Sequence, residues 1–171
     1  MKKMDDQVRG NVIQPQANVN AQRPLILYVE DNFENRHTTK LNLERKYNLL
    51  FAVNDREACD MFIRHGDRLA LILMDIELQD SALNGMELSR LVRGMLDRKK
   101  DIPYAQNVPV LKIPIIFVTA YANVYQKAQI LLSGGNDIIE KPVDFVTLEM
   151  TMTKYHLSQR SKAINAQFDR R

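Results

Sequence analysis

The sequence lacks several features that define common classes of protein. Its single cysteine, Cys59, excludes an internal disulfide and fits a reducing cytoplasm. No apolar stretch approaches the roughly 18 to 20 residues of a membrane span, and residues 1–24 contain no apolar segment of a secretory signal. The three histidines, His37, His65 and His156, have no metal-ligand spacing. We therefore expect a cytoplasmic protein without a membrane span, and we expect Cys59 to act as a small buried hydrophobic residue.

Charge is also scarce where a nucleic-acid-binding surface would need it. The net charge of +3 divides into +2 over residues 1–23, −2 over 24–144 and +3 over 145–171. A nucleic-acid-binding fold would carry its basic excess as a patch on the core, whereas here the excess lies in the two ends. The sequence thus gives no support for a nucleic-acid partner.

What the chain does have is the composition of a soluble globular domain. Its 171 residues, 45% hydrophobic and 26% charged, suffice for one domain with a full core. Residues 1–22 are polar and rich in Gln and Asn, and they predict a disordered N-terminal tail. We place the domain at 23–160, and 161–171 as an extension of the last helix or a tail.

Apolar runs alternate with segments of helical character along this domain. The predicted strands are 24–31, 48–54, 69–75, 113–120 and 137–142. The predicted helices are 33–47, 55–66, 85–96, 123–135 and 144–164, with Asp55 as the N-cap of the second and Gly134-Gly135 as the stop of the fourth. Five β-α units in series predict an α/β fold whose parallel sheet is covered by helices on both faces.

Four of the five predicted strands end in polar residues. Glu30 and Asp31 end the first strand, Asp75 ends the third, and Thr119 and Lys141 lie at the ends of the fourth and the fifth. In parallel sheets, ligands bind beyond the carboxyl ends of the strands. If these strands are neighbours, the carboxylates suit Mg²⁺, and the lysine and threonine suit a phosphoryl group.

These residues give the chain a resemblance to a known family. It resembles the receiver domain of two-component response regulators from about residue 24 to about 157, through the motifs "YVEDN", "LMDIEL", "FVTA" and "EKP". The resemblance implies a flavodoxin-like, doubly wound, five-stranded sheet in the order 2-1-3-4-5. It also implies a cis peptide bond before Pro142.

The resemblance also implies a role for each site residue. Asp75 would accept a phosphoryl group from a phosphohistidine. Asp31 would be the main Mg²⁺ ligand, with Glu30 assisting through water and the backbone carbonyl of Glu77 completing the protein ligands. The remaining two roles would fall to Lys141, which would pair with the phosphoryl oxygens, and to Thr119, which would donate a hydrogen bond to them.

Three departures from the family pattern concern the surroundings of this site. Ile138 stands where the family usually has an aromatic residue that moves with the threonine. The loop over 76–85 carries about two extra residues, and 97–112 forms an extended connection that we expect to be functional or mobile. Glu77 and Tyr121 occupy variable positions that flank the phosphoryl group in this family, with an effect on phosphoryl lifetime that the sequence leaves open.

The resulting prediction is a single-domain response regulator, not an enzyme, that signals by protein–protein contact. Its partners would be a sensor histidine kinase or phosphotransfer protein and an unknown downstream protein. Apolar residues at Tyr155, Ile164 and Phe168 leave open a homodimer or partner contact through the last helix. Two alternatives stay open: a receiver-fold scaffold that works without phosphorylation, and a hydrolase that uses Asp75 as a nucleophile.

Overall fold

The computed structural model describes residues 23–97, 101–123, 125 and 127–168, and of 160 and 162–168 only the backbone. Five parallel strands form one sheet in the order β2-β1-β3-β4-β5. Their bounds are Leu25–Val29 (β1), Asn48–Ala52 (β2), Leu69–Met74 (β3), Ile115–Thr119 (β4) and Asp137–Glu140 (β5). The predicted fold class and strand order are therefore confirmed. The predicted N-terminal tail, 1–22, and the side chains of Ile164 and Phe168 lie outside the described residues.

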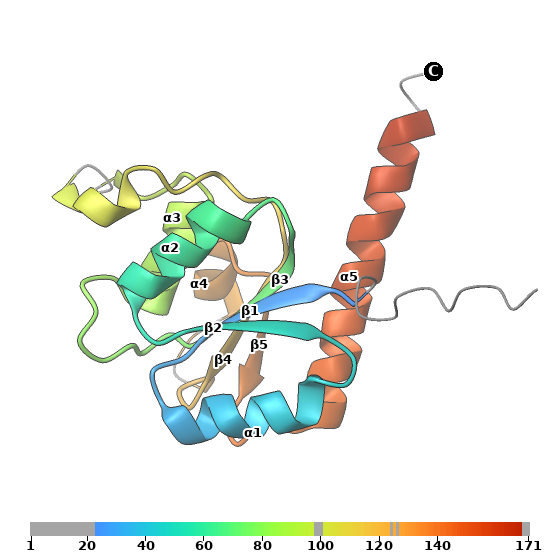
Figure 1. The fold of residues 1–171 in the computed structure, drawn as a ribbon, viewed down its shortest axis with the longest axis horizontal. Helices are drawn as coiled ribbons and strands as arrows, with labels where there is room; N and C mark the ends of the chain where they lie inside the picture. The colour runs from blue at the N-terminus through green and yellow to red at the C-terminus, as the bar shows by residue number, and fades with distance from the viewer. Residues whose placement is uncertain (1–22, 98–100, 124, 126, 169–171) are drawn as a thin grey trace, which may run out of the picture.

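Helices cover both faces of the sheet. They are α1 (Phe33–Leu43), α2 (Asp55–His65), α3 (Gly85–Val92), α4 (Lys127–Leu132) and α5 (Phe145–Phe168), with a short 3₁₀ helix, η3, at Pro103–Ala105. In Figure 1, α1 and α5 lie on one side of the sheet while α2 and α3 lie on the other. Parallel strands need such crossover connections, because consecutive strands must start at the same edge of the sheet.

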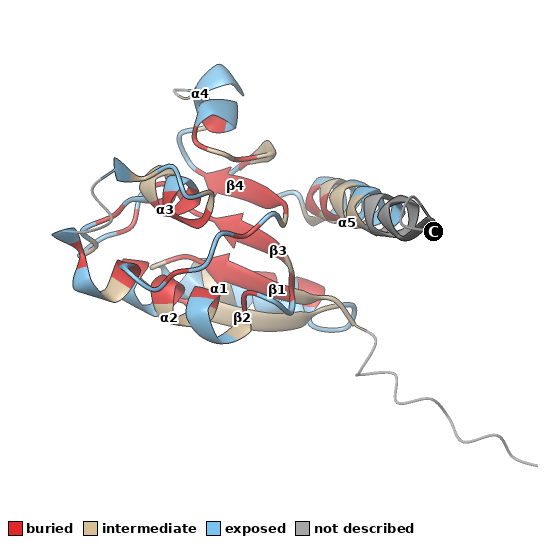
Figure 2. Cartoon of the chain, turned by 90° about the horizontal axis from the view of Figure 1, so that it is seen from above, coloured by how far each residue is buried: buried red, intermediate tan, exposed pale blue. Residues whose placement is uncertain are grey.

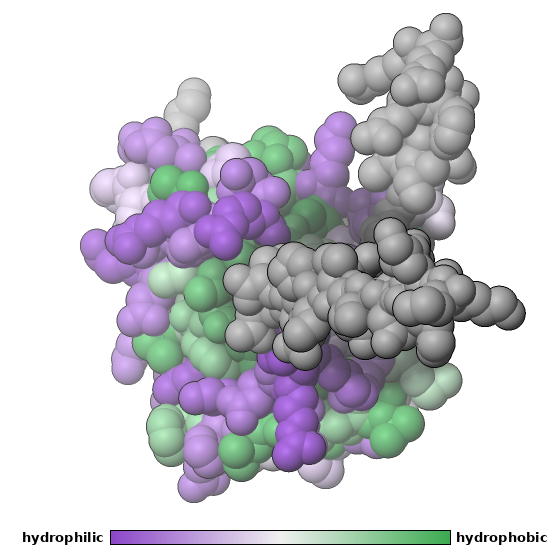
Figure 3. Space-filling model, turned by 45° about the vertical axis from the view of Figure 1, so that its right-hand side comes forward, coloured by the Kyte–Doolittle hydropathy of each residue, from purple (hydrophilic) through white to green (hydrophobic). Residues whose placement is uncertain are grey.

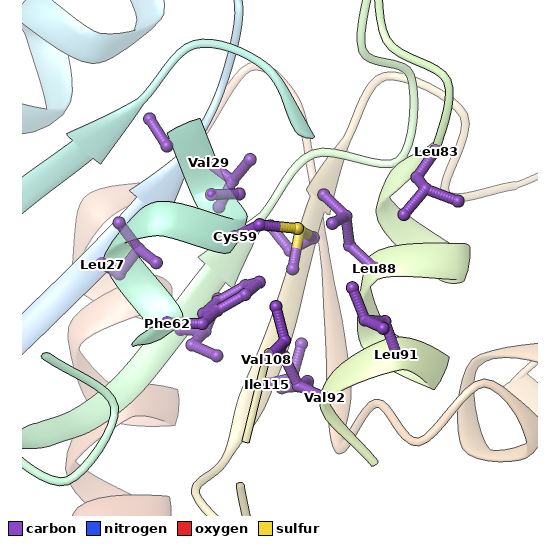
Figure 4. Packing of buried hydrophobic residues seen from close by; sticks show 14 of the residues in the cluster. Leu27, Val29, Cys59, Phe62, Leu83, Leu88, Leu91, Val92, Val108 and Ile115 are labelled. Carbon is purple, nitrogen blue, oxygen red and sulfur yellow. The ribbon is translucent and has the colours of Figure 1, made fainter. Parts of the chain in front are cut away.

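The strands alternate their side chains between two hydrophobic cores. In β1, Leu27 and Val29 belong to the core under α2 and α3, whereas Ile26 and Tyr28 belong to the core under α1 and α5. Figure 2 shows β1, β3 and β4 as largely buried strands. Cys59 is fully buried beside Phe62 and the core residues of β1, as predicted (Figure 4).

Several predicted helix ends differ from the structure. The N-cap of α2 is Asn54, whose side chain accepts from the backbone of Glu57, so the prediction of Asp55 as the cap was wrong. Helix α3 ends at Val92, four residues early, because Gly94 adopts a left-handed backbone (φ 71°). The stop of α4 near Gly134 (φ 87°) agrees with the prediction.

The extended connection before β4 is part of the core in the portion that the structure describes. Four of its residues are buried against the α2 side of the sheet: Ile102, Ala105, Val108 and Leu111. Arg93 fastens its end by donating to the carbonyl oxygens of Leu111 and, at 2.8 Å, Ile113. Residues 101–112 therefore form a packed insertion that is held to α3.

The last helix joins the sheet through Tyr155. Its ring packs against the core under α1 and α5, and its phenol donates to the Asn136 carbonyl at 2.8 Å. Tyr155 thus belongs to the domain itself. The face in Figure 3 carries hydrophilic and hydrophobic side chains next to each other. Among the described residues, no helix combines the length and the apolar character that a membrane crossing requires.

Candidate functional site

Three carboxylates meet at the carboxyl edge of the sheet. Glu30 and Asp31 follow β1, and Asp75 follows β3, which pairs with β1 so that Val29 lies opposite Met74. One side-chain oxygen from each of the three acids lies within 4.8 Å of the others. Asp75 and Glu30 are almost completely buried, at 6% and 0% exposure. The structure thus brings together the three acids that the sequence placed at strand ends.

Lys141, which follows β5, enters the same group. Its Nζ lies 2.6 Å from Glu30 Oε2 and also forms an ion pair with Asp75 Oδ2. Burial acts to lower the pKa of Lys141, but the hydrogen bonds and charges of Asp75 and Glu30 outweigh burial, so the pKa is raised. The ammonium therefore stays charged between two buried acids. The peptide bond from Lys141 to Pro142 is cis, as predicted.

Asp75 combines burial with a charged partner. Besides the contact with Lys141, its carboxylate accepts hydrogen bonds from the backbone N–H of Ile76 and, at 3.4 Å, from that of Glu77. Burial raises the pKa of Asp75 to about 6, against the lowering effect of Lys141 and with a further raising effect of Glu30. A buried carboxylate with a perturbed pKa next to a specific charge is typical of a reactive group.

Glu30 is held by neutral donors that the sequence analysis missed. The Tyr28 phenol donates to Glu30 Oε2 at 2.6 Å, and the Asn35 amide donates to Oε1 at 2.9 Å. Burial, and then Glu30, raises the pKa of Tyr28. A tyrosine inside an otherwise apolar buried strand requires a partner for its hydroxyl, so Tyr28 itself was a signal in the sequence.

The start of α1 fixes the backbone of the first two acids. Asn32 caps the helix by accepting from the Asn35 N–H at 2.9 Å. One turn later, Arg36 donates to the carbonyl oxygens of Glu30 at 2.8 Å and Asp31 at 2.7 Å. These contacts tie the end of β1 to α1 and leave the two carboxylates directed into the site.

The loop from β3 to α3 also contacts the acidic cluster. The Gln79 N–H donates to Asp31 Oδ2 at 3.0 Å. Helix α3 begins with a capping box between Asn84 and Glu87. A Cβ on Gly85 would lie 1.9 Å from the Asp75 carbonyl oxygen, so only glycine allows α3 to approach the end of β3 this closely.

Thr119, the remaining predicted site residue with a polar side chain at a strand end, is the last residue of β4 and is fully buried. Its hydroxyl accepts from the Tyr121 N–H at 3.2 Å, and its carbonyl accepts from the Lys141 N–H at 2.9 Å. The Glu77 side chain is exposed and accepts from the Tyr125 phenol at 2.8 Å. Tyr125 is therefore a further neighbour of the site that the sequence analysis missed.

The donor atoms fit a hard divalent cation. All three clustered ligands are carboxylate oxygens, which suit Mg²⁺ and not the softer metals that prefer nitrogen or sulfur. Within the part of the chain that the structure describes, no other group of three such side chains is close enough to share an ion. Among the residues that the structure describes, the Lys141 ammonium is the cation that pairs with these acids.

Comparison with known proteins identifies a family. Residues 26–153 match the model of the response regulator receiver domain. The chain is 28% identical over 145 residues to the osmosensing histidine protein kinase SLN1 of Saccharomyces cerevisiae, a match that covers 82% of this chain and 11% of the kinase.

Two solved structures show the same arrangement of strands and helices. One is the receiver domain of the response regulator Ssk1 in a co-crystal with the histidine phosphotransfer protein Ypd1, both from S. cerevisiae (29% identity, TM-score 0.63, covering 80% of this chain and 91% of that one). The other is a CheY-like receiver domain protein from Methanospirillum hungatei JF-1 (25% identity, TM-score 0.63, covering 82% and 99%).

Proposed function

The chain belongs to the response regulator receiver domain family, and we propose that it accepts a phosphoryl group on Asp75 and signals through protein–protein contact. The observation that carries the proposal is the setting of Asp75. It is a buried carboxylate at the end of a central strand, in contact with an ammonium and clustered with two more acids.

The chemistry proposed for Asp75 is nucleophilic. A carboxylate oxygen forms a bond to phosphorus while the bond from phosphorus to the donor's histidine nitrogen breaks, and the histidine leaves with the electron pair of that bond. Such transfers depend mainly on positioning and on neutralisation of charge. The Glu77 N–H and Lys141 orient the carboxylate before attack.

Mg²⁺ fits this site, where Asp31, Asp75 and the Glu77 carbonyl would hold it, with Glu30 assisting through water. When bound, the ion supplies positive charge that offsets the repulsion between the acids and the phosphoryl oxygens. Lys141 already lies against Asp75 and Glu30, so it would pair with a phosphoryl oxygen after a small movement. The Thr119 hydroxyl would exchange its contact with the Tyr121 N–H for a hydrogen bond donated to the phosphoryl group.

The comparisons favour a donor that carries phosphohistidine. The Ssk1 receiver domain was crystallised with a histidine phosphotransfer protein, and the chain also resembles a segment of a histidine kinase. We propose a sensor kinase or phosphotransfer protein as donor for this chain. The output would follow from a shift between two conformations that differ in affinity for a downstream protein.

The test is intact-mass measurement after incubation with acetyl phosphate and Mg²⁺. We expect one phosphoryl increment in the wild type, none in Asp75→Asn, and a full increment in the control Asp80→Asn, which alters an exposed acid of the same loop. EDTA should abolish the increment. Failure of the wild type with both acetyl phosphate and a phosphorylated donor protein would contradict the proposal and favour the scaffold. Continuous release of phosphate from an ester would favour the hydrolase.

A further inference from the structure

A second buried aspartate lies outside the acidic cluster. Asp55, the first residue of α2, is 3% exposed. Its Oδ2 accepts from the N–H groups of Ala82 at 3.1 Å and Leu83 at 3.0 Å, and also from the Tyr104 phenol. Its own N–H donates to the Ser81 hydroxyl at 3.2 Å. One carboxylate oxygen thus gathers three donors from two distant segments.

Those two segments are the ones that we described from the sequence as longer than usual. Residues 81–83 belong to the lengthened loop between β3 and α3, and Tyr104 belongs to η3 in the packed insertion before β4. The Tyr104 ring is covered by the Arg56 guanidinium, 4.6 Å from its centroid, on the next residue of α2. Asp55 therefore joins the loop, the insertion and α2 at one point.

The same loop reaches the acidic cluster at its other end. The Gln79 N–H donates to Asp31 Oδ2, and the Glu77 N–H lies over Asp75. Between these contacts and Asp55 lies Asp80, whose backbone is left-handed (φ 53°). A non-glycine residue rarely adopts this conformation, so the loop needs anchors on both sides to keep it.

We propose that Asp55 and Tyr104 are positioning residues for the metal site, because they fix the loop that presents the Gln79 N–H to Asp31 and that would present the Glu77 carbonyl to a bound ion. This inference deepens the proposed function and rests on it for the identity of the ion. Neither residue touches the acids, so both act through the loop. The insertion that carries Tyr104 thereby becomes part of the machinery of the site.

A purely structural role makes a different prediction. If the contact only stabilises the fold, its loss lowers the stability but leaves the affinity of the folded protein for Mg²⁺ unchanged. If the contact positions the loop, the affinity falls as well. Loss of an outer-shell partner weakens metal binding by about tenfold to a hundredfold, and a single hydroxyl should lie at the lower end of that range.

The experiment compares Tyr104→Phe with Tyr155→Phe in the full chain. Each change removes one phenol hydroxyl that contacts an aspartate, but Tyr155 contacts Asp137 and Asn136 at β5, away from the loop. Titration with Mg²⁺ alone, followed by NMR, should give a Kd about tenfold higher for Tyr104→Phe and unchanged for Tyr155→Phe. Amide hydrogen exchange at Gln79 and Leu83 should accelerate only in Tyr104→Phe.

A second variant, Asp55→Asn, keeps one oxygen acceptor but loses the carboxylate charge, and it should also raise the Kd for Mg²⁺ and accelerate exchange at Gln79. Unchanged Mg²⁺ affinity and unchanged Gln79 exchange in folded Tyr104→Phe would overturn the inference, whatever its stability. Exchange at Gln79 needs neither metal nor phosphoryl group. A wild type that takes up no phosphoryl group would therefore defeat the proposed function and still leave the positioning role under test.

Discussion

Asp75 and Asp55 are two buried aspartates at the same edge of one sheet, and their surroundings differ in kind. Asp55 Oδ2 receives two backbone N–H groups and a phenol. Asp75 receives an ammonium and the backbone N–H groups of Ile76 and Glu77, with a second acid, Glu30, bound to the same ammonium. Asp55 is satisfied by neutral donors, whereas Asp75 shares its charged partner with another acid.

The difference separates a carboxylate suited to a structural role from one suited to the reactive role that we propose. A buried carboxylate with fixed hydrogen bonds contributes to stability, and its removal leaves the donors without partners. A buried carboxylate that shares one cation with another acid is held in an unfavourable state, which a metal or a phosphoryl group would relieve. Substitution at the two positions should therefore have opposite effects on stability.

The largest effect is expected at Asp55. Asp55→Ala leaves two backbone N–H groups and a phenol without their acceptor, so the free energy of unfolding should fall by about 2–5 kcal/mol. Asp75→Ala in EDTA should be neutral or stabilising. Urea denaturation of both variants measures the difference, with Asp80→Asn as a control at an exposed acid whose left-handed backbone asparagine tolerates. Equal losses at both positions would remove the distinction between the two aspartates.

The next effect concerns pH in the metal-free protein. Because the pKa of Asp75 is raised to about 6 in the folded state, the folded protein binds this proton more tightly than the unfolded chain does. Its contribution to stability is therefore greatest below about pH 4, decreases as pH rises to about 6, and is constant above that. Over this interval, the contribution of Asp75 to the free energy of unfolding should fall by about 3 kcal/mol in total.

Comparison with Asp75→Asn isolates this contribution from the other acids. The stability of the variant relative to the wild type should increase between about pH 4 and pH 6 and then level off. Urea denaturation in EDTA at several pH values gives the curve. A difference that does not vary with pH over this interval would show that the fold does not raise the pKa of Asp75.

The sequence predicts the place of Asp75, the proposed phosphoryl acceptor, far better than the contacts of Asp55. Asp75 follows directly on an apolar run, and the strand order then brings it to Glu30 and Lys141, so local pattern and sheet topology suffice. Asp55 also follows a strand, where it has the pattern of a helix N-cap. Its actual partners, 26 to 49 residues away, depend on how two irregular segments pack, which no local periodicity encodes.

The same limit explains the errors at helix ends. Helix α3 stops where Gly94 turns left-handed and Arg93 reaches Leu111 and Ile113, although the apolar spacing continues to Leu96. The environment of Tyr28 could be predicted in part. Its burial followed from the strand pattern, and its need for a partner followed from its hydroxyl, but Glu30 as that partner required the structure.

Tyr28→Phe tests whether Glu30 behaves like Asp55, which neutral donors satisfy, or like Asp75. Glu30 shares Lys141 with Asp75, yet it also receives neutral donors from Tyr28 and Asn35, as Asp55 does. Loss of a hydrogen bond to a buried charge should lower the free energy of unfolding by about 2 kcal/mol. A smaller loss, or a gain, in urea denaturation would place Glu30 with Asp75, and Tyr47→Phe serves as a control at a half-buried phenol away from the site.

The smallest effect is expected at Tyr125, which repeats the phenol–carboxylate contact of Tyr104 in a more exposed setting. Burial and then a carboxylate raise the pKa of both tyrosines to about 12, so the two contacts are similar in chemistry. They differ because Asp55 is buried, whereas Glu77 is exposed and water can replace the lost hydroxyl. Tyr125→Phe should change the free energy of unfolding by less than about 0.5 kcal/mol, and Tyr104→Phe by about 1–3 kcal/mol. Parallel urea denaturation of the two variants compares the same phenol–carboxylate hydrogen bond in two environments. Equal losses would mean that the number of partners of the carboxylate, and not its burial, decides how much the bond contributes to the free energy of unfolding.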